Sequence, residues 1–281
     1  MNRLRDNSPV IIILIIFVLI IVGFEFVPLY SVITSSFQDN TGQGFSLAQY
    51  SNALKNPFYY QSIKNSILIS LESSIVGIII ATIGANSISK FSTRVREKII
   101  TMSNMTSNFS GVPLAFAFII ILGNNGVFTL IFKKFGINLA SSFNLYSISG
   151  LQLVYIYFQI PLGILLMYPA FDAIKEEWKD AASILGASSF QFWKNIGITV
   201  LLPSMIGTFN IMFANAMGAY ATALALTNGS INLMPLRIGA LVSGDIFMNP
   251  MQASALAVIL GLILTIVNII NVKLIRKERT I

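Results

Sequence analysis

Long apolar stretches constrain this chain more than any other feature of its sequence. A helix needs about 20 mainly apolar residues to cross a bilayer, and residues 10–22 alone form an unbroken apolar run. The first stretch is too long for the core of a signal peptide, and we interpret it as an uncleaved span. The sequence predicts an all-α membrane protein whose six spans cover residues 9–33, 63–88, 99–122, 151–171, 199–226 and 251–272.

The composition supports a membrane protein and excludes several other classes. Hydrophobic residues make up 55% of the 281 residues and charged residues only 10%, whereas soluble proteins carry about 25% charged residues. The chain has no cysteine and no histidine, which excludes a disulfide scaffold and removes the usual ligands of zinc. We therefore expect no metal site, and a membrane enzyme with a Cys or His catalyst is excluded.

Lysine and arginine residues are distributed unevenly between the two sides of the predicted spans. Of the 18, 13 lie at the N-terminus, between spans two and three, between spans four and five, and in the C-terminal tail. Because cytoplasmic loops carry the excess of Lys and Arg, both termini are predicted to be cytoplasmic. The net charge of +7 is thus a signal of topology, and we expect no nucleic-acid partner.

The connection between the fourth and fifth spans, residues 172–198, has a helical pattern of its own. Acidic residues precede its apolar positions, Ile184 widens them, and Gly186 follows, where it can end a helix or let another backbone approach closely. From this pattern alone, an amphipathic helix lying on the membrane is an equally good interpretation. The residues at the i, i+3, i+4 and i+7 spacing of one apolar stripe are Trp178, Ala181, Ala182 and Leu185.

This connection resembles the EAA motif of the permease subunits of binding-protein-dependent ATP-binding-cassette (ABC) importers. Residues 180–182 (DAA) are followed after three residues by Gly186, and residues 201–203 (LLP) close the pattern. Asp180 stands where the family has Glu, and Thr199 replaces the first of two prolines, whereas Pro203 keeps the second. Further strings that resemble these permeases are residues 65–71, 111–126, 218–226 and 233–240.

The resemblance implies a fold and a set of partners. The fold is the type I ABC importer permease (MetI-like) fold with six transmembrane helices. The expected parts are an N-terminal span and extracytoplasmic loop (1–62), a five-helix core with the coupling loop 172–198 (63–272), and a cytoplasmic tail (273–281). The chain would form half of a pathway in the bacterial inner membrane, with a second, non-identical permease, two cytoplasmic ATPase subunits and an extracytoplasmic solute-binding protein.

The resemblance also implies that the coupling loop docks on the ATPase. The chain has no GxxxxGK[ST] phosphate-binding loop, so we expect no cofactor and no enzymatic activity in it, with ATP and Mg bound by the partner ATPase. The branch that the sequence favours imports small charged solutes (polyamines, ferric ion, thiamine or phosphonates). The implied ATPase-coupling residues are Asp180, Ala181, Ala182, Leu185, Gly186, Ala187 and Pro203.

Polar residues within the predicted spans are candidates for lining a translocation cavity. Ionisable residues at membrane depth are costly and face protein or water. Glu25 is expected near the outer headgroups, whereas Glu72 lies deeper and can either line a path or bond to neighbouring helices. Interhelical hydrogen bonding is the alternative role for the whole set. The cavity candidates are Glu72, Asn108, Ser110, Asn215 and Tyr220.

A secondary active transporter is the main alternative function, because it too uses polar residues at membrane depth. The sequence has no inverted internal repeat, no matching pair of broken helices and no acidic relay. A channel would need a filter string or a charged ring, and neither is visible. These features favour the importer permease.

The predicted topology can be tested with single cysteines, because the natural chain has none. We expect Asn40→Cys to react with a membrane-impermeant thiol reagent in intact cells, since residue 40 is predicted to lie outside. Lys277→Cys is expected to stay unlabelled until the membrane is opened. Labelling of Lys277→Cys in intact cells would contradict the cytoplasmic placement of the C-terminus.

Overall fold

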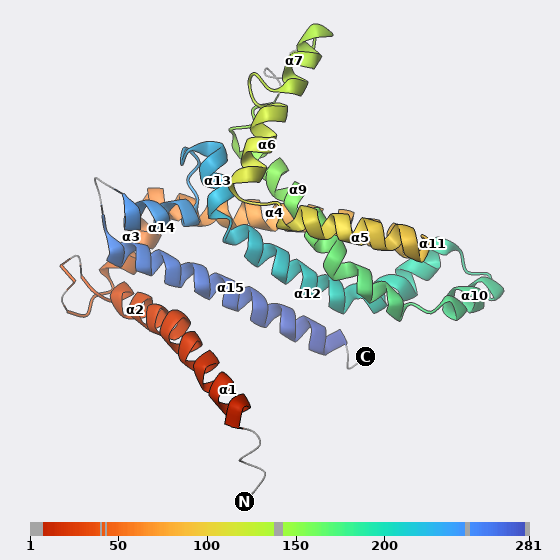
Figure 1. Cartoon of the computed structure of the whole chain (residues 1–281), viewed down its shortest axis with the longest axis horizontal. Helices are drawn as coiled ribbons and strands as arrows, with labels where there is room; N and C mark the ends of the chain where they lie inside the picture. The colour runs from red at the N-terminus through yellow and green to blue at the C-terminus, as the bar shows by residue number, and fades with distance from the viewer. Residues whose placement is uncertain (1–7, 40, 43, 138–142, 245–247, 279–281) are drawn as a thin grey trace, which may run out of the picture. The chain divides into compact units, whose positions relative to one another are not determined.

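A computed structural model of the chain describes residues 8–39, 41–42, 44–137, 143–244 and 248–278. Within these ranges the chain is almost entirely helical (Figure 1). In this described part, six helices are long and apolar enough to cross a membrane. The predicted class, an all-α membrane protein with six spans, is confirmed.

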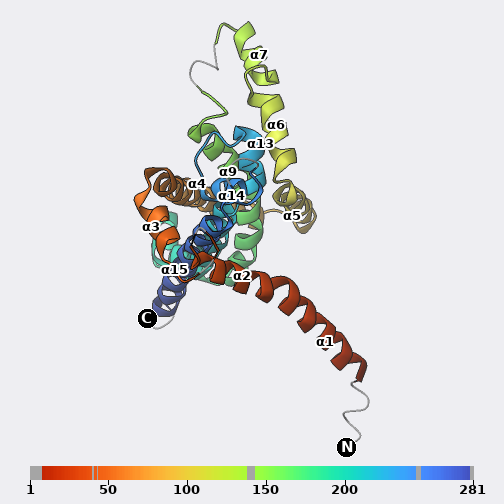
Figure 2. The same cartoon turned by 90° about the vertical axis from the view of Figure 1, so that its left-hand side faces the viewer.

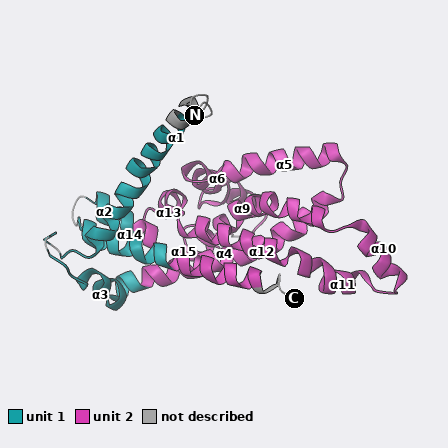
Figure 3. Ribbon diagram, turned by 90° about the horizontal axis from the view of Figure 1, so that it is seen from below, with its two compact units in different colours: residues 1–60, 237–262 teal, residues 61–236, 263–281 magenta. Residues whose placement is uncertain are grey.

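Packing divides the chain into two compact units, which Figure 3 shows in different colours. Unit 1 contains residues 1–60 and 237–262, and unit 2 contains residues 61–236 and 263–281. These units reflect packing within the chain, and the expected parts 1–62, 63–272 and 273–281 stay predictions. The helices that contribute residues to both units are α4 (Pro57–Ser89), α14 (Met234–Ser243) and α15 (Pro250–Glu278).

Unit 1 begins with a helix that changes its winding in the middle. Pro28 has no backbone N–H, and its ring would clash with the carbonyl of Phe24 in a regular α-helix; a π-helical turn, η2, accommodates it. The apolar helix extends over Ile13–Ser36, so Glu25 lies near its middle, and the expectation of a place near its outer end is wrong. The elements wholly within unit 1 are α1 (Ser8–Ile21), η2 (Val22–Phe26), α2 (Val27–Ser36) and α3 (Ala48–Lys55).

Buried amides hold the rest of unit 1 together. The Gln252 side chain is fully buried; its Oε1 accepts a bond from Asn52 Nδ2 at 2.9 Å, and its Nε2 donates to the Gln49 carbonyl at 3.2 Å. The Arg237 guanidinium lies 5.0 Å from the centre of the Phe58 ring. Burial lowers the pKa of Arg237, and the nearby Tyr59 opposes this shift; an arginine stays charged at neutral pH all the same.

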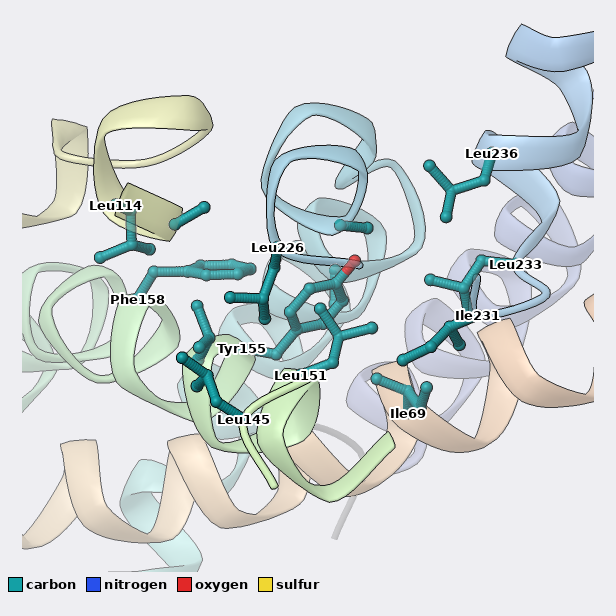
Figure 4. Close-up of a cluster of buried hydrophobic side chains, with 14 residues drawn as sticks. Ile69, Leu114, Leu145, Leu151, Tyr155, Phe158, Leu226, Ile231, Leu233 and Leu236 are labelled. Atoms are coloured by element: carbon teal, nitrogen blue, oxygen red, sulfur yellow. The ribbon is translucent and has the colours of Figure 1, made fainter. Parts of the chain in front are cut away.

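Unit 2 contains most of the helices, and its longest members lie side by side in Figures 1 and 2. Its hydrophobic centre lies between α6, α9, α13 and the segment before α14, where Leu114, Tyr155, Phe158 and Leu226 meet (Figure 4). The elements wholly within unit 2 are α5 (Thr93–Asn108), α6 (Val112–Leu122), α7 (Val127–Lys134), α9 (Ile148–Met167), η3 (Tyr168–Ala173), α10 (Glu176–Ile184), α11 (Ser189–Phe192), η4 (Trp193–Gly197), α12 (Ile198–Met217) and α13 (Tyr220–Thr227).

A stripe of small residues runs along the buried face of α4. Successive members are three or four positions apart, which places them on one side of the helix. Small side chains at this spacing let neighbouring membrane helices approach closely, because little volume separates the backbones. The members of the stripe are Ser62, Ser66, Ser70, Ser74, Gly77, Ala81 and Ala85, all of which are buried.

Gln159 of α9 joins α4 and α12 at the centre of this stripe. Its fully buried Nε2 donates to Ser74 Oγ of α4 at 3.0 Å and to the Met212 carbonyl of α12 at 3.0 Å. The backbones are close here: a Cβ added at Gly163 would lie 2.6 Å from the Ala81 Cβ. A buried polar side chain thus fixes three helices in register where packing is tightest.

Two of the expected spans are interrupted. The third, expected at 99–122, is broken at Phe109–Gly111, and the apolar membrane helix lies at Val112–Lys134 instead. Figures 1 and 2 show α6 and α7 turning away from the direction of α5. The fifth, expected at 199–226, is broken after Met217, where its apolar helix ends. Gly111 has a φ of +73°, a conformation that glycine adopts without strain.

Gly163→Ala tests the close packing of α4 against α9. The added methyl meets the Cβ of Ala81, which cannot move without its backbone, so we expect a loss of about 1–3 kcal/mol in the free energy of unfolding. Gly207→Ala in α12 is the matched control, because a Cβ at Gly207 would meet nothing within 4 Å. Thermal unfolding in detergent measures both, and equal midpoints for the two variants would contradict the packing.

Candidate functional site

The two helix breaks of unit 2 face each other and form a hollow. It has a volume of about 220 Å³ and is lined by residues from the α5–α6 break, from α9 and from the α12–α13 break. Breaks in membrane helices are tolerated where the freed backbone groups find partners or face water. The lining residues are Ser110, Gly111, Phe158, Asn215, Gly218, Ala219, Tyr220, Ala221 and Thr222.

Side-chain hydrogen bonds stabilise the broken backbone around this hollow. The Gly111 N–H donates to Thr222 Oγ1 at 2.9 Å, which ties the start of α6 to α13. The Tyr155 hydroxyl of α9 donates to the Ala219 carbonyl at 2.9 Å, and Figure 4 shows its ring packed within the hydrophobic cluster. The hollow is therefore held by hydrogen bonds across three helices.

Three of the five cavity candidates line this hollow. Ser110 comes from the first break, and Asn215 and Tyr220 come from the second. Thr222, Gly111 and Phe158 were missed by the sequence analysis, although Gly111 together with Pro113 and Gly218 marks where the helices break.

The other two cavity candidates lie elsewhere. Glu72 is exposed on α4 and accepts a hydrogen bond from Gln152 Nε2 of α9. Asn108 is exposed near the end of α5, where its Nδ2 donates to the Asn104 carbonyl at 2.9 Å. Neither residue lines the hollow. Glu72 is bonded to a neighbouring helix, and Asn108 is bonded within its own helix.

The coupling loop (172–198) forms two short helices, α10 and α11, with a tight turn between them. The turn is a Schellman motif: the Ala187 N–H donates to the Ala182 carbonyl at 2.9 Å and the Gly186 N–H to the Ser183 carbonyl at 3.0 Å. Gly186 has a φ of +77°, which explains glycine at this position. Ser188 and Gln191 then form a capping box that begins α11.

The inner face of the coupling loop is packed against the membrane helices of unit 2. Ala182 is buried in a hydrophobic cluster with Phe171, Phe192 and Leu201. Trp193 packs beside them, with its ring centre 5.8 Å from that of Phe192 and 6.3 Å from that of Phe171. The loop is thus attached firmly to α9 and α12.

The outer face of the coupling loop exposes large apolar side chains. Ile184 and Leu185 are each 86% exposed and Phe190 is 75% exposed. Of the four residues of the predicted stripe, Ala182 is buried, whereas Trp178, Ala181 and Leu185 are exposed. The four residues therefore do not form one buried face of α10.

The remaining predicted coupling residues are divided between surface and core. Asp180, Ala181 and Gly186 are exposed, and Ala187 is half-buried. Pro203 lies inside α12, beyond the loop, and is half-buried there. In the part of the chain that the structure describes, no three Cys, His, Asp or Glu side chains gather as a metal site would require.

Residues 73–280 match the sequence model of a family described as the inner membrane component of binding-protein-dependent transport systems. The chain belongs to this family. Its members are transport subunits, so the chain is a multi-pass membrane transport protein and not an enzyme. Membership decides against the secondary active transporter and the channel, and it confirms the resemblance drawn from the motif.

Individual relatives agree with this assignment over most of the chain. The spermidine/putrescine permease PotC of Escherichia coli K12 is 22% identical over 268 residues, which are 94% of either chain. The spermidine/putrescine permease PotB of Haemophilus influenzae Rd is 24% identical over 247 residues, 86% of this chain and 85% of PotB.

A solved structure shares the fold. A chain of a bacterial alginate ABC transporter, in complex with an alginate-bound periplasmic protein, superimposes with a TM-score of 0.74 at 13% identity. The match covers 96% of this chain and 94% of that one. The type I importer permease fold is confirmed.

Cysteine reactivity tests whether the hollow contains water. We expect Ser110→Cys to react with a small charged thiol reagent, because thiolates form only where water reaches them. Ser70→Cys on the buried face of α4 is the matched control and should stay unreactive, since Ser70 is 1% exposed. If the two variants react at the same rate, the hollow is not open to water.

Proposed function

We propose that this chain is the permease of an ATP-driven importer and that its coupling loop docks on a cytoplasmic ATPase. The observation that carries the proposal is that three large apolar side chains of this loop, Ile184, Leu185 and Phe190, are each at least 75% exposed. Exposed apolar side chains outside the membrane spans can mark a surface that a partner covers. The match of this loop to the EAA pattern supports the same role.

The packing of the loop suits the transmission of force. Its inner face, with Ala182 and Phe192, belongs to one hydrophobic cluster with residues of α9 and α12. A packed interface moves as a rigid body and does not deform gradually. Movement of a docked ATPase would therefore be passed to the helices that line the hollow.

The ATPase supplies the energy in this proposal. The chain has no phosphate-binding loop, so ATP and Mg are bound by two ATPase subunits on the cytoplasmic side. Closure of the ATPase pair on nucleotide would turn the pathway outward, and hydrolysis would return it. This cycle is alternating access between two discrete arrangements.

A second permease and a binding protein complete the assembly. The sequence carries one copy of the EAA-like motif, and we propose that a second, non-identical permease supplies the other half of the pathway. The alginate transporter that shares the fold binds a periplasmic protein, which supports an extracytoplasmic binding protein here. We place the complex in the bacterial inner membrane.

The solute is a small charged compound, and polyamines are the first candidates within this class. The relatives PotC and PotB are named as spermidine/putrescine permeases. The hollow offers hydroxyl and amide groups from Ser110, Asn215 and Thr222, which can bond an ammonium group without holding it tightly. Ferric ion, thiamine and phosphonates are the other candidates, and stimulation of ATP hydrolysis by a loaded binding protein distinguishes them.

Gly186→Arg tests the docking of the coupling loop. Gly186 is exposed, and a Cβ added there would meet nothing within 4 Å in this chain, so the side chain begins in open space and can extend toward a docked partner. The left-handed φ costs a non-glycine residue about 1–2 kcal/mol. We expect normal amounts of protein in the membrane, no solute uptake, and loss of the ATPase during purification.

Gly136→Arg is the matched control. Gly136 has a φ of +79°, is exposed and would likewise meet nothing within 4 Å of an added Cβ. It therefore carries the same backbone cost and the same added charge at a site away from the coupling loop. If Gly186→Arg transports like Gly136→Arg and keeps its ATPase, the docking proposal is wrong.

A further inference from the structure

Two hollows of opposite character lie side by side where α4 leaves the apolar region. One is apolar, with a volume of about 300 Å³, and the other is polar, with a volume of about 290 Å³. They share Asn86 of α4, Phe171 of η3 and Trp193 of η4. The two hollows therefore adjoin at these residues, and all of their lining residues belong to unit 2.

The apolar hollow is a groove between α4 and the start of α12. Ile79 and Ile83 form one wall of the groove, and both are more than half exposed. None of the described residues that line the groove is charged. Exposed isoleucine side chains on a membrane-spanning helix are covered by lipid hydrocarbon. The residues that line only this hollow are Ile79, Thr82, Ile83, Ile198, Leu201 and Met205.

The polar hollow collects charges of both signs. Lys90 extends from the residue after α4, Asp172 comes from η3, and Glu176 and Lys179 come from α10. It thus contains two ammonium groups and two carboxylates within about 290 Å³. Trp193 lies where the two hollows join, and tryptophan is enriched at the boundary between hydrocarbon and headgroups.

We propose that a phospholipid with a zwitterionic, primary-amine headgroup, phosphatidylethanolamine, binds across the two hollows. An acyl chain lies along Ile79 and Ile83, and the headgroup occupies the polar hollow. The lipid phosphate accepts from Lys90 and Lys179, and its ammonium donates to Asp172 and Glu176. Each charged group of the hollow thus meets a group of opposite charge on the lipid headgroup.

Other membrane lipids fit this pattern less well. An anionic lipid such as phosphatidylglycerol would satisfy the lysines but leave Asp172 and Glu176 beside a phosphate without a cation. Phosphatidylcholine carries an ammonium that has no N–H to donate, and its three methyl groups make it larger. Of these three headgroups, only that of phosphatidylethanolamine provides both a phosphate acceptor and a cationic group whose N–H bonds can donate to carboxylates.

This lipid site is distinct from the solute hollow. Phe158 lines the solute hollow and Phe171 lines the lipid site, and 13 residues of helix separate them by about 20 Å. The lipid would contact α4, α12, η3 and α10 together. It would therefore stabilise the junction between the membrane helices and the coupling loop.

Photo-crosslinking tests the site in the full chain, purified with the subunits that stay bound and reconstituted into phosphatidylcholine vesicles. The probe is phosphatidylethanolamine with a diazirine in its acyl chain. We expect crosslinks on α4 near Ile83 and on α12 near Ile198, and competition by unlabelled phosphatidylethanolamine. Equal competition by phosphatidylglycerol, or crosslinks spread evenly over the apolar helices, would overturn the proposal.

Variants of each hollow separate the acyl chain from the headgroup. Ile83→Trp fills the apolar groove and should lower crosslinking about tenfold, the effect of losing about 1.4 kcal/mol of binding. Ile80→Trp is the matched control, since Ile80 is exposed on the same helix but does not line the groove. Equal crosslinking of the two variants contradicts the site.

Lys90→Gln and Asp172→Asn test the site independently if Ile83→Trp fails to fold. Both side chains are exposed, so these substitutions should leave the fold intact. Each removes one headgroup contact and should weaken competition by phosphatidylethanolamine about fivefold, as expected for one charge near a lipid surface. Lys98→Gln, outside both hollows, controls for the loss of a positive charge. A Lys98→Gln effect as large as that of Lys90→Gln shows general attraction to the membrane and overturns the proposal.

Discussion

Close contact between α4, α9 and α12 is the constraint on which the rest of unit 2 depends. Lipid tails are as apolar as leucine, so membrane helices associate through van der Waals contact and hydrogen bonds. The small residues of α4 allow the van der Waals contact. Gln159 provides the hydrogen bonds, which it donates to Ser74 and to the Met212 carbonyl. The hollow lies toward one end of these helices and the predicted coupling loop toward the other.

The hollow at the two helix breaks depends on a second requirement, the satisfaction of backbone polar groups within the membrane. A helix that breaks within a membrane must satisfy its freed N–H and C=O groups inside the protein. Thr222 and Tyr155 do so for the breaks at Gly111 and Ala219. The Asn215 and Tyr220 side chains line the hollow beside these hydrogen bonds, so the groups that stabilise the breaks and the groups proposed to meet the solute are adjacent.

The sequence predicted the all-α membrane class with six spans and the resemblance to the permease family. It did not predict where two of the spans are interrupted. Apolar run length predicts spans well because each run must cross the same thickness of hydrocarbon. Run length does not register a break of two or three residues such as Phe109–Gly111. The pairing of Glu72 with Gln152 joins residues 80 positions apart. Ala182 is buried while Leu185, three positions later, is exposed. Both need the tertiary arrangement, which periodicity does not contain.

The predicted coupling loop has buried and exposed apolar side chains on both sides of the Schellman turn at Gly186. Ala182 and Phe192 are constrained by the core, whereas Ile184, Leu185 and Phe190 touch little of their own chain. Substitutions at these exposed positions should therefore cost the chain little stability. Under the proposed docking, the same membrane helices could work with different ATPases, because only the exposed side chains of the loop would have to change.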